Sequence, residues 1–226
     1  MSEQQDASDT SLSKPRLKIT EIFYSLQGEA RSVGLPTVFV RLTGCPLRCV
    51  YCDTAYAFSG GEWMDIDAIL EKVQQYKTRH VTVTGGEPLA QKDCRLLLTR
   101  LCDRGYDVSL ETSGAILLDM VDPRVVKVMD VKTPASQEEA KNKLENFSYI
   151  DEKDQIKFVI ADKQDYQWSK ELVEKYGLGS KCEILFSPVH DKLDAVKLAD
   201  WILDDQLDVR FQIQLHKYLW GDLPGV

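Results

Sequence analysis

The chain has 226 residues, of which 43% are hydrophobic and 28% are charged, a composition typical of globular proteins. Its formal net charge of -8 and pI near 5.0 argue against polyanion binding, and it has no basic stripe of the kind that nucleic-acid binders carry. No apolar run approaches the roughly 18 residues that a membrane span needs.

The N-terminal stretch 1–14 is polar and rich in small residues, and it lacks the basic and apolar regions of a secretory signal. We predict a disordered tail at 1–14 and a single domain over 15–226 in a cytoplasmic protein. In that reducing compartment, clustered cysteines are more often metal ligands or redox groups than disulfides.

Seven strands are predicted, most of them continuous apolar runs typical of strands buried on both faces of a parallel sheet. They cover 37–42, 80–85, 107–112, 125–131, 155–160, 183–189 and 209–214.

Helical patterns separate these strands. Asp65 can cap a helix with apolar positions Ile66, Ile69, Leu70 and Val73. A second helix carries the stripe Cys94, Leu97, Leu98, Leu101 and Cys102, and further helices are expected near 137–147, 162–176 and 191–204. This alternation predicts an α/β fold whose functional residues gather at the carboxyl ends of parallel strands.

The stretch GCPLRCVYCDT (44–54) follows the first predicted strand and holds Cys45, Cys49 and Cys52 in the spacing C-x3-C-x2-C. A disulfide would use at most two of these cysteines, and tetrahedral structural zinc takes four ligands. Three thiolates from one loop suit a [4Fe–4S] cluster with one iron left open. The remaining cysteines lie at predicted core positions: Cys94, Cys102 and Cys182.

This cysteine loop, with an aromatic residue at Tyr51, resembles the signature loop of the radical S-adenosylmethionine (radical SAM) superfamily, in which the open iron chelates SAM. TGGEP (84–88) resembles the GGE motif of that superfamily. Four further stretches resemble the 7-carboxy-7-deazaguanine synthase (QueE) family: EIFYSLQGE (21–29), FVRLTGC (39–45), CDT (52–54) and QLHKYLW (214–220). The similarity runs from about residue 19 to the C-terminus.

The resemblance implies a partial (β/α) barrel and a homodimer. It implies a lyase that converts 6-carboxy-5,6,7,8-tetrahydropterin to 7-carboxy-7-deazaguanine with release of ammonia, in the biosynthesis of queuosine or another 7-deazapurine. The implied cofactors are a [4Fe–4S] cluster, SAM and Mg²⁺, and a flavodoxin- or ferredoxin-type protein would supply electrons.

The same resemblance assigns substrate contacts to Leu26, Gln27, Gly28, Arg41, Thr84 and His216. An amide at Gln27 suits the lactam edge of a pterin, and the guanidinium fork of Arg41 suits a carboxylate. For Gly28, Thr84 and His216, the alternatives are a turn, an ordinary strand end and an exposed basic pair with Lys217.

The resemblance assigns SAM contacts to Tyr51, Cys52, Asp53, Gly86, Glu87, Asp130, Val131, Lys132, Ser187, Pro188, Val189 and His190. The carboxylate of Glu87 suits the SAM ammonium group, with an exposed turn glutamate as the alternative. Relatives often read Ser-Pro-Lys where this chain has residues 130–132, and Gln-Pro where it has 187–188. Under the resemblance, Thr54 would bind Mg²⁺ through its hydroxyl; without the resemblance, the sequence predicts that Thr54 caps a helix.

Other functions remain open at this point. A glycyl-radical-enzyme activase shares the cysteine spacing but would need a docking surface for a large protein and no pterin site, so LQGE, CDT and HKYLW count against it. An electron carrier would need a fourth cysteine near the three, and a metal-stabilised binding module gives no reason for GGEP at the same sheet edge.

Overall fold

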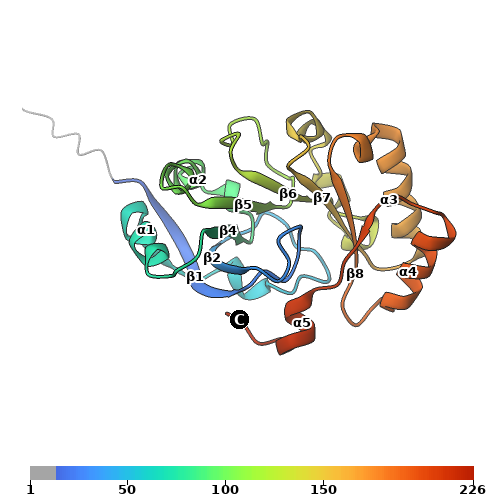
Figure 1. The fold of residues 1–226 in the computed structure, drawn as a ribbon, viewed down its shortest axis with the longest axis horizontal. Helices are drawn as coiled ribbons and strands as arrows, with labels where there is room; N and C mark the ends of the chain where they lie inside the picture. Colours follow the sequence, from blue (N-terminus) through green and yellow to red (C-terminus); the bar gives the residue numbers. More distant parts are fainter. Residues whose placement is uncertain (1–13) are drawn as a thin grey trace, which may run out of the picture.

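The computed structural model describes residues 14–226, and one sheet of nine strands runs through them in the order β3-β1-β2-β4-β5-β6-β7-β8-β9. The first strand, β1, pairs antiparallel with β2 and β3, whereas all pairs from β2 to β9 are parallel. The sheet curves without closing between its end strands, as Figure 1 shows. The predicted partial barrel of largely parallel strands is confirmed. The predicted tail at 1–14 falls almost wholly on residues 1–13, which lie outside the described part.

Six of the seven predicted strands are present with nearly the expected bounds. The strands are β1 (Arg16–Leu26), β2 (Pro36–Leu42), β3 (Glu62–Asp65), β4 (His80–Gly85), β5 (Asp107–Thr112), β6 (Val126–Asp130), β7 (Gln155–Ile160), β8 (Glu183–Pro188) and β9 (Arg210–Phe211). The central parallel strands β4 to β8 are mostly buried, as continuous apolar runs predict.

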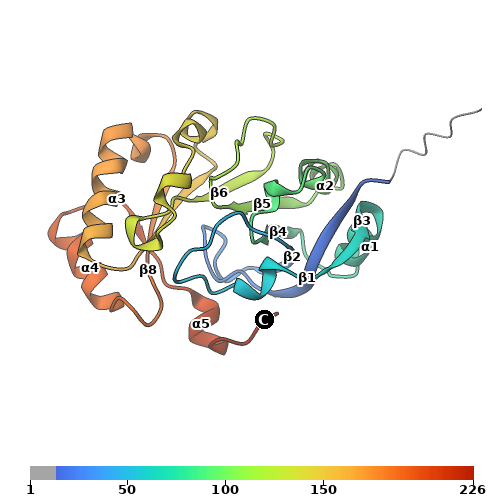
Figure 2. The same cartoon turned by 180° about the vertical axis from the view of Figure 1, so that it is seen from behind.

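Four helices cover the outer face of the sheet, and α5 lies with the C-terminus at its open side (Figure 1; Figure 2). The four are α1 (Ile66–Gln74), α2 (Cys94–Asp103), α3 (Lys163–Tyr176) and α4 (Ala195–Asp204), and α5 covers Leu215–Trp220. Asp65 occupies the N-cap position of α1, but its side chain makes no capping hydrogen bond. Cys94 and Cys182 are buried as predicted, while Cys102 is only partly buried against the core.

The predicted helix near 137–147 is wrong, because that segment forms short 3-10 turns whose asparagines bind neighbouring loops. The Asn142 side chain exchanges hydrogen bonds with the backbone of Lys132 (2.9 and 2.8 Å). The Asn146 amide donates to the carbonyls of Gly114 and Ile116. Such side-chain to backbone bonds compete with helix formation.

The last predicted strand, 209–214, is also shorter than expected, since β9 ends at Phe211. Beyond it, the chain turns toward the loop between β1 and β2. The Gln212 side chain pairs with both backbone groups of Ala30, at 2.7 and 2.8 Å, and Leu215 N donates to Gly28 O. The C-terminal segment thus covers the gap in the open barrel.

Three elements were not predicted at all: β1, β3 and α5. The last expected helix, 191–204, begins instead at Ala195, where Asp194 accepts a hydrogen bond from Val196 N. Within residues 14–226, no helix combines the length and the apolar character that crossing a membrane requires.

Candidate active site

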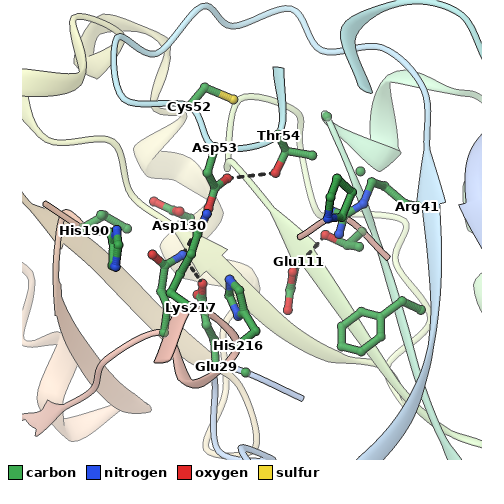
Figure 3. Close-up of a pocket in the computed structure, with 18 of the residues that line it drawn as sticks. Glu29, Arg41, Cys52, Asp53, Thr54, Glu111, Asp130, His190, His216 and Lys217 are labelled. Carbon is green, nitrogen blue, oxygen red and sulfur yellow. Dashed lines mark hydrogen bonds between the residues drawn. The ribbon is translucent and has the colours of Figure 1, made fainter. Parts of the chain in front are cut away.

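A cavity of about 530 Å³ opens at the carboxyl ends of the parallel strands. Its walls come from β1, β2 and β4 to β7, the loops after β1, β2 and β8, and the C-terminal segment. Figure 3 shows Glu29, Asp53 and Asp130 gathered on one side of this cavity, with Arg41 on the other. The site is therefore rich in charged groups that come from distant parts of the chain.

The loop that follows β2 carries the three clustered cysteines, all of them partly buried and free. Gly44 begins it at φ 99°, a left-handed conformation that favours glycine. The Leu47 amide donates to Cys45 Sγ at 3.4 Å, and Cys52 N donates to Cys49 O at 3.2 Å. Burial raises the pKa of all three thiols, and the nearby Lys132 ammonium opposes that rise.

The GGE stretch at the end of β4 packs directly beneath the cysteine loop. Glu87 N donates to Gly44 O at 2.9 Å, and a Cβ on Gly86 would lie 2.3 Å from the same carbonyl oxygen. The Glu87 side chain is fully buried, and its carboxylate accepts hydrogen bonds from the amides of Leu89 and Ser113 and from the hydroxyls of Thr112 and Ser113. It joins the ends of β4 and β5 and does not line the cavity.

A chain of buried ion pairs crosses the cavity floor. Lys157 Nζ bonds Glu29 and lies 3.4 Å from Asp130 Oδ2, and Lys132 Nζ lies 3.1 Å from the same oxygen. Burial alone would raise the pKa values of both carboxyls, but the two ammonium groups outweigh it and hold those pKa values low. The second Asp130 oxygen, Oδ1, is buried without a hydrogen-bond partner among the described residues.

Glu111 on β5 is a third carboxyl in the cavity, and its pKa shifts in the opposite direction to those of Glu29 and Asp130. Thr84 Oγ1 and Gln27 Nε2 donate to it at 2.8 and 3.3 Å, but no cation pairs with it among residues 14–226. Burial, reinforced by the nearby Glu29 carboxylate, raises the pKa of Glu111. Two carboxyls in one cavity with pKa values pushed apart are suited to different acid–base roles.

Arg41 projects from β2 into the other side of the cavity. Its Nε donates to Glu21 at 2.7 Å, and Tyr56 OH donates to the same oxygen at 2.8 Å. Phe23 and Phe39 stack beside it with ring centroids 4.9 Å apart, which gives this side a flat apolar wall. A planar ring could lie against that wall with an anionic group near the guanidinium.

Asp53 and Thr54 end the cysteine motif at the mouth of the cavity. Thr54 Oγ1 donates to Asp53 Oδ1 at 2.8 Å, and Gln214 Nε2 bridges Asp53 and Glu29. Thr54 precedes a 3-10 helix (Ala55–Phe58) but makes no capping hydrogen bond, so its oxygen lone pairs face no backbone donor of that helix. The alternative interpretation of Thr54 as a cap is not supported.

The C-terminal segment forms the remaining wall. His216 lies against Gly28, where a Cβ would approach its Nδ1 to 2.1 Å, and residues 221–226 line the cavity. Burial lowers the pKa of His216, which keeps the imidazole neutral at pH 7. The glycine in LQGE therefore allows a side chain from the far end of the sequence to pack here.

Comparisons with known proteins agree with this geometry. The family model for the Radical SAM superfamily matches residues 39–201. The 7-carboxy-7-deazaguanine synthase of Chlorobaculum tepidum is 46% identical over 93% of this chain and 97% of its own, and that of Koribacter versatilis is 43% identical over 90% and 97%. The chain belongs to the 7-carboxy-7-deazaguanine synthase family. The crystal structure of QueE from Escherichia coli shares the fold, with a TM-score of 0.74, 24% identity and coverage of 89% of this chain and 95% of that one.

Membership of this radical SAM family means that the chain uses a [4Fe–4S] cluster and SAM. The donor set fits the cluster: three free thiols lie on one loop, and Cys49 and Cys52 face the cavity. Within residues 14–226, no three His, Cys, Asp or Glu side chains converge as ligands of a single ion. A cluster needs no such convergence, because each cysteine binds a different iron atom.

The structure brings most of the predicted site residues of this synthase-family chain to the one cavity. Those that line it are Leu26, Gln27, Gly28, Arg41, Cys49, Tyr51, Cys52, Asp53, Thr54, Thr84, Gly86, Asp130, Lys132, Val189, His190 and His216. Five others lie beside it without lining it: Cys45, Glu87, Val131, Ser187 and Pro188. Gln27 is almost fully buried, and its amide already bonds Thr82, Glu111 and Glu29 N, so it holds the site together.

Sequence reasoning missed Glu29, Glu111, Lys157, Ser113 and Gln214, all of which line the cavity. Glu29 belongs to the LQGE stretch, so the motif itself pointed to it. For Lys157 the signal was a charged residue between apolar neighbours inside a strand, since a buried charge needs a partner. For Glu111 it was a carboxylate near the end of a mostly buried strand.

Gly86→Ala is expected to disrupt the cysteine loop. Its new Cβ would lie 2.3 Å from Gly44 O and 2.7 Å from Cys45 Cβ, so the loop must shift, at a cost of about 1–3 kcal/mol in the free energy of unfolding. We expect reduced iron content after anaerobic reconstitution. Gly179→Ala is the matched control, because a Cβ there meets nothing within 4 Å. Equal iron content in the two variants would contradict this role of Gly86.

Proposed function

We propose that this protein converts 6-carboxy-5,6,7,8-tetrahydropterin to 7-carboxy-7-deazaguanine with release of ammonia. The observation that carries the proposal is the meeting of the cysteine loop, the ion-pair chain and the aromatic wall beside Arg41 in one cavity. Relatives at 43–46% identity over most of the chain carry the name of this synthase. The glycyl-radical activase alternative is not favoured by these relatives.

Held by Cys45, Cys49 and Cys52, the cluster would supply, together with SAM, the chemistry for removing a hydrogen atom from C6 of the pterin. The chain itself binds and orients the substrate and keeps water out. Arg41 would bind the substrate carboxylate, while the pterin ring lies along Phe23 and Phe39.

The two unlike carboxyls would share the recognition of the pterin. Glu29, held ionised by Lys157, accepts hydrogen bonds from ring N–H groups. Glu111 has a raised pKa, so in its neutral form it offers one O–H donor to the ring or to the departing amine. On the SAM side, Lys132 and Asp130 line the cavity beside Cys49 and Cys52.

Magnesium would bind at Thr54, with the substrate carboxylate and water completing its oxygen ligands. The proposal is supported by the Thr54 hydroxyl, which makes no capping bond and lines the cavity next to Asp53. The cation would act as a Lewis acid on the substrate carboxylate.

A homodimer, a flavodoxin- or ferredoxin-type reductant and a cytoplasmic location also belong to this proposal. The exposed apolar side chains of α5, among them Tyr218 and Leu219, support an interface, and Val50 is exposed on the cysteine loop where a reductant could approach. Light scattering and reduction assays with purified flavodoxin test the first two.

The decisive experiment is anaerobic turnover of the carboxytetrahydropterin with SAM and a reductant, with and without Mg²⁺. We expect 7-carboxy-7-deazaguanine and ammonia, and a stimulation by Mg²⁺ that Thr54→Ala weakens several-fold. Ser59→Ala, an exposed hydroxyl nearby, serves as the control. Formation of 5′-deoxyadenosine without any deazapurine would contradict the substrate, and unchanged Mg²⁺ dependence in Thr54→Ala would contradict the magnesium site.

A further inference from the structure

The cysteine loop is held along one side by residues 133–138, which follow β6 and include the 3-10 helix Pro134–Ser136. Three hydrogen bonds join them. Val50 N donates to Ser136 O at 3.2 Å, Arg48 N donates to Glu138 Oε1, and Tyr51 OH lies 3.1 Å from Thr133 Oγ1. We call residues 133–138 the bracket.

Asp165, in the first turn of α3, anchors the bracket from behind. Its side chain is 1% exposed and accepts hydrogen bonds from Thr133 Oγ1 and Ala135 N, both at 2.9 Å, and from Ala161 N at 3.0 Å. Thr133 Oγ1 has one proton and lies nearer Asp165 Oδ2 (2.9 Å) than Val159 O (3.2 Å), so we assign that proton to the carboxylate. Tyr51 OH is then within donor distance of Thr133 Oγ1 at 3.1 Å and of Val159 O at 3.3 Å. A continuous relay therefore runs from α3 through Thr133 to the residue before Cys52. Asp165 itself does not line the cavity.

The bracket also controls which groups surround the cysteine sulfurs. Hydrogen bonds to the sulfurs and nearby charge both set the reduction potential of an iron–sulfur cluster. The amides of Arg48 and Val50 donate to bracket oxygens and not to a cysteine sulfur. Glu138 further adds a negative charge beside the loop. Both features disfavour the added electron and oppose the nearby Lys132 ammonium, which favours it.

We propose that the bracket, anchored by Asp165, positions the cysteine loop and keeps the reduction potential of the bound cluster low. Asp165, Thr133 and Glu138 act through the loop, so they are positioning residues. The proposal depends on the [4Fe–4S] cluster but not on the identity of the substrate, so a failure of the pterin assay leaves it testable.

The first test is an EPR-monitored redox titration of reconstituted Glu138→Ala. Loss of the acceptor and its charge is expected to give about tenfold more reduced cluster at a fixed potential, which for a one-electron couple is about 59 mV. Glu139→Ala is the matched control, since its neighbouring exposed carboxylate makes no bond to the loop within residues 14–226. An unchanged midpoint in Glu138→Ala, or an equal rise in Glu139→Ala, would overturn the tuning role.

The second test is Thr133→Val, which keeps the shape of the side chain and breaks the relay between Asp165 and Tyr51. We expect full iron content but several-fold weaker SAM binding, measured by the change of the EPR signal on SAM addition. Thr133→Ser, which retains the hydroxyl, should restore the binding. Wild-type SAM affinity in Thr133→Val, or equal weakening in Thr133→Ser, would overturn the positioning role.

Discussion

Cys49→Ala is expected to abolish both 5′-deoxyadenosine and 7-carboxy-7-deazaguanine formation and to remove most of the roughly four irons of the reconstituted protein. Cys49 is one of only three thiols on the loop, and it faces the cavity. Two remaining cysteines cannot replace it, because the cluster already lacks one protein ligand. Iron analysis and EPR of the reduced protein measure the loss, and product analysis measures the activity.

Cys102→Ala is the control for this substitution. Cys102 is also a free, partly buried cysteine, but it lies on α2 and packs against the core. Its variant should keep its iron and its activity, while both variants should unfold at similar denaturant concentrations without iron. Retention of activity in Cys49→Ala would remove the basis of the cluster assignment.

The parallel part of the fold was predictable because its strands are apolar on both faces. Runs such as QIKFVI and EILFSP differ clearly from the helices between them. β1 escaped prediction because Lys18, Thr20 and Glu21 interrupt its apolar residues, and its register shifts between Ile19 and Glu21. Its pairing with β2 and β3, and not its own pattern, makes this segment a strand.

The site was predictable where its residues are neighbours in the sequence, as in the cysteine loop and LQGE. Residues that are distant in the sequence and meet only in the folded chain could not be predicted. Glu87 is an example. The motif suggests that its carboxylate binds SAM, whereas in the structure the carboxylate is buried against Thr112 and Ser113 at the end of β5. His216 likewise reaches Gly28 only because the C-terminal segment covers the open barrel.

The ion-pair chain joins three segments of the cavity wall. Lys157 lies between Glu29, on the loop after β1, and Asp130, at the end of β6. Burial acts to lower the pKa of Lys157, but the two carboxylates outweigh it and raise that pKa well above its ordinary value. The Lys157 ammonium thus holds Glu29 ionised and shares Asp130 with Lys132.

Lys157→Met is therefore expected to reduce the free energy of unfolding at pH 7 by about 3–5 kcal/mol, because it leaves Glu29 without its cation and Asp130 with Lys132 alone. The lowered pKa values of Glu29 and Asp130 fix the pH dependence. In the wild type their stabilisation is present above the unfolded pKa values, near 4, and is lost as the pH falls through the folded values. The difference between variant and wild type should hence shrink in acid.

Urea unfolding of the iron-free protein at several pH values measures this effect without cluster chemistry. Lys170→Met is the control, since the Lys170–Asp205 pair (2.8 Å) is about one-third exposed and water screens such surface pairs, so they stabilise the fold little. Binding of the pterin should also weaken, because Glu29 would take up a proton and lose part of its acceptor strength. A Lys157→Met protein as stable as the Lys170→Met control at pH 7 would show that Lys157 does not hold these carboxylates ionised.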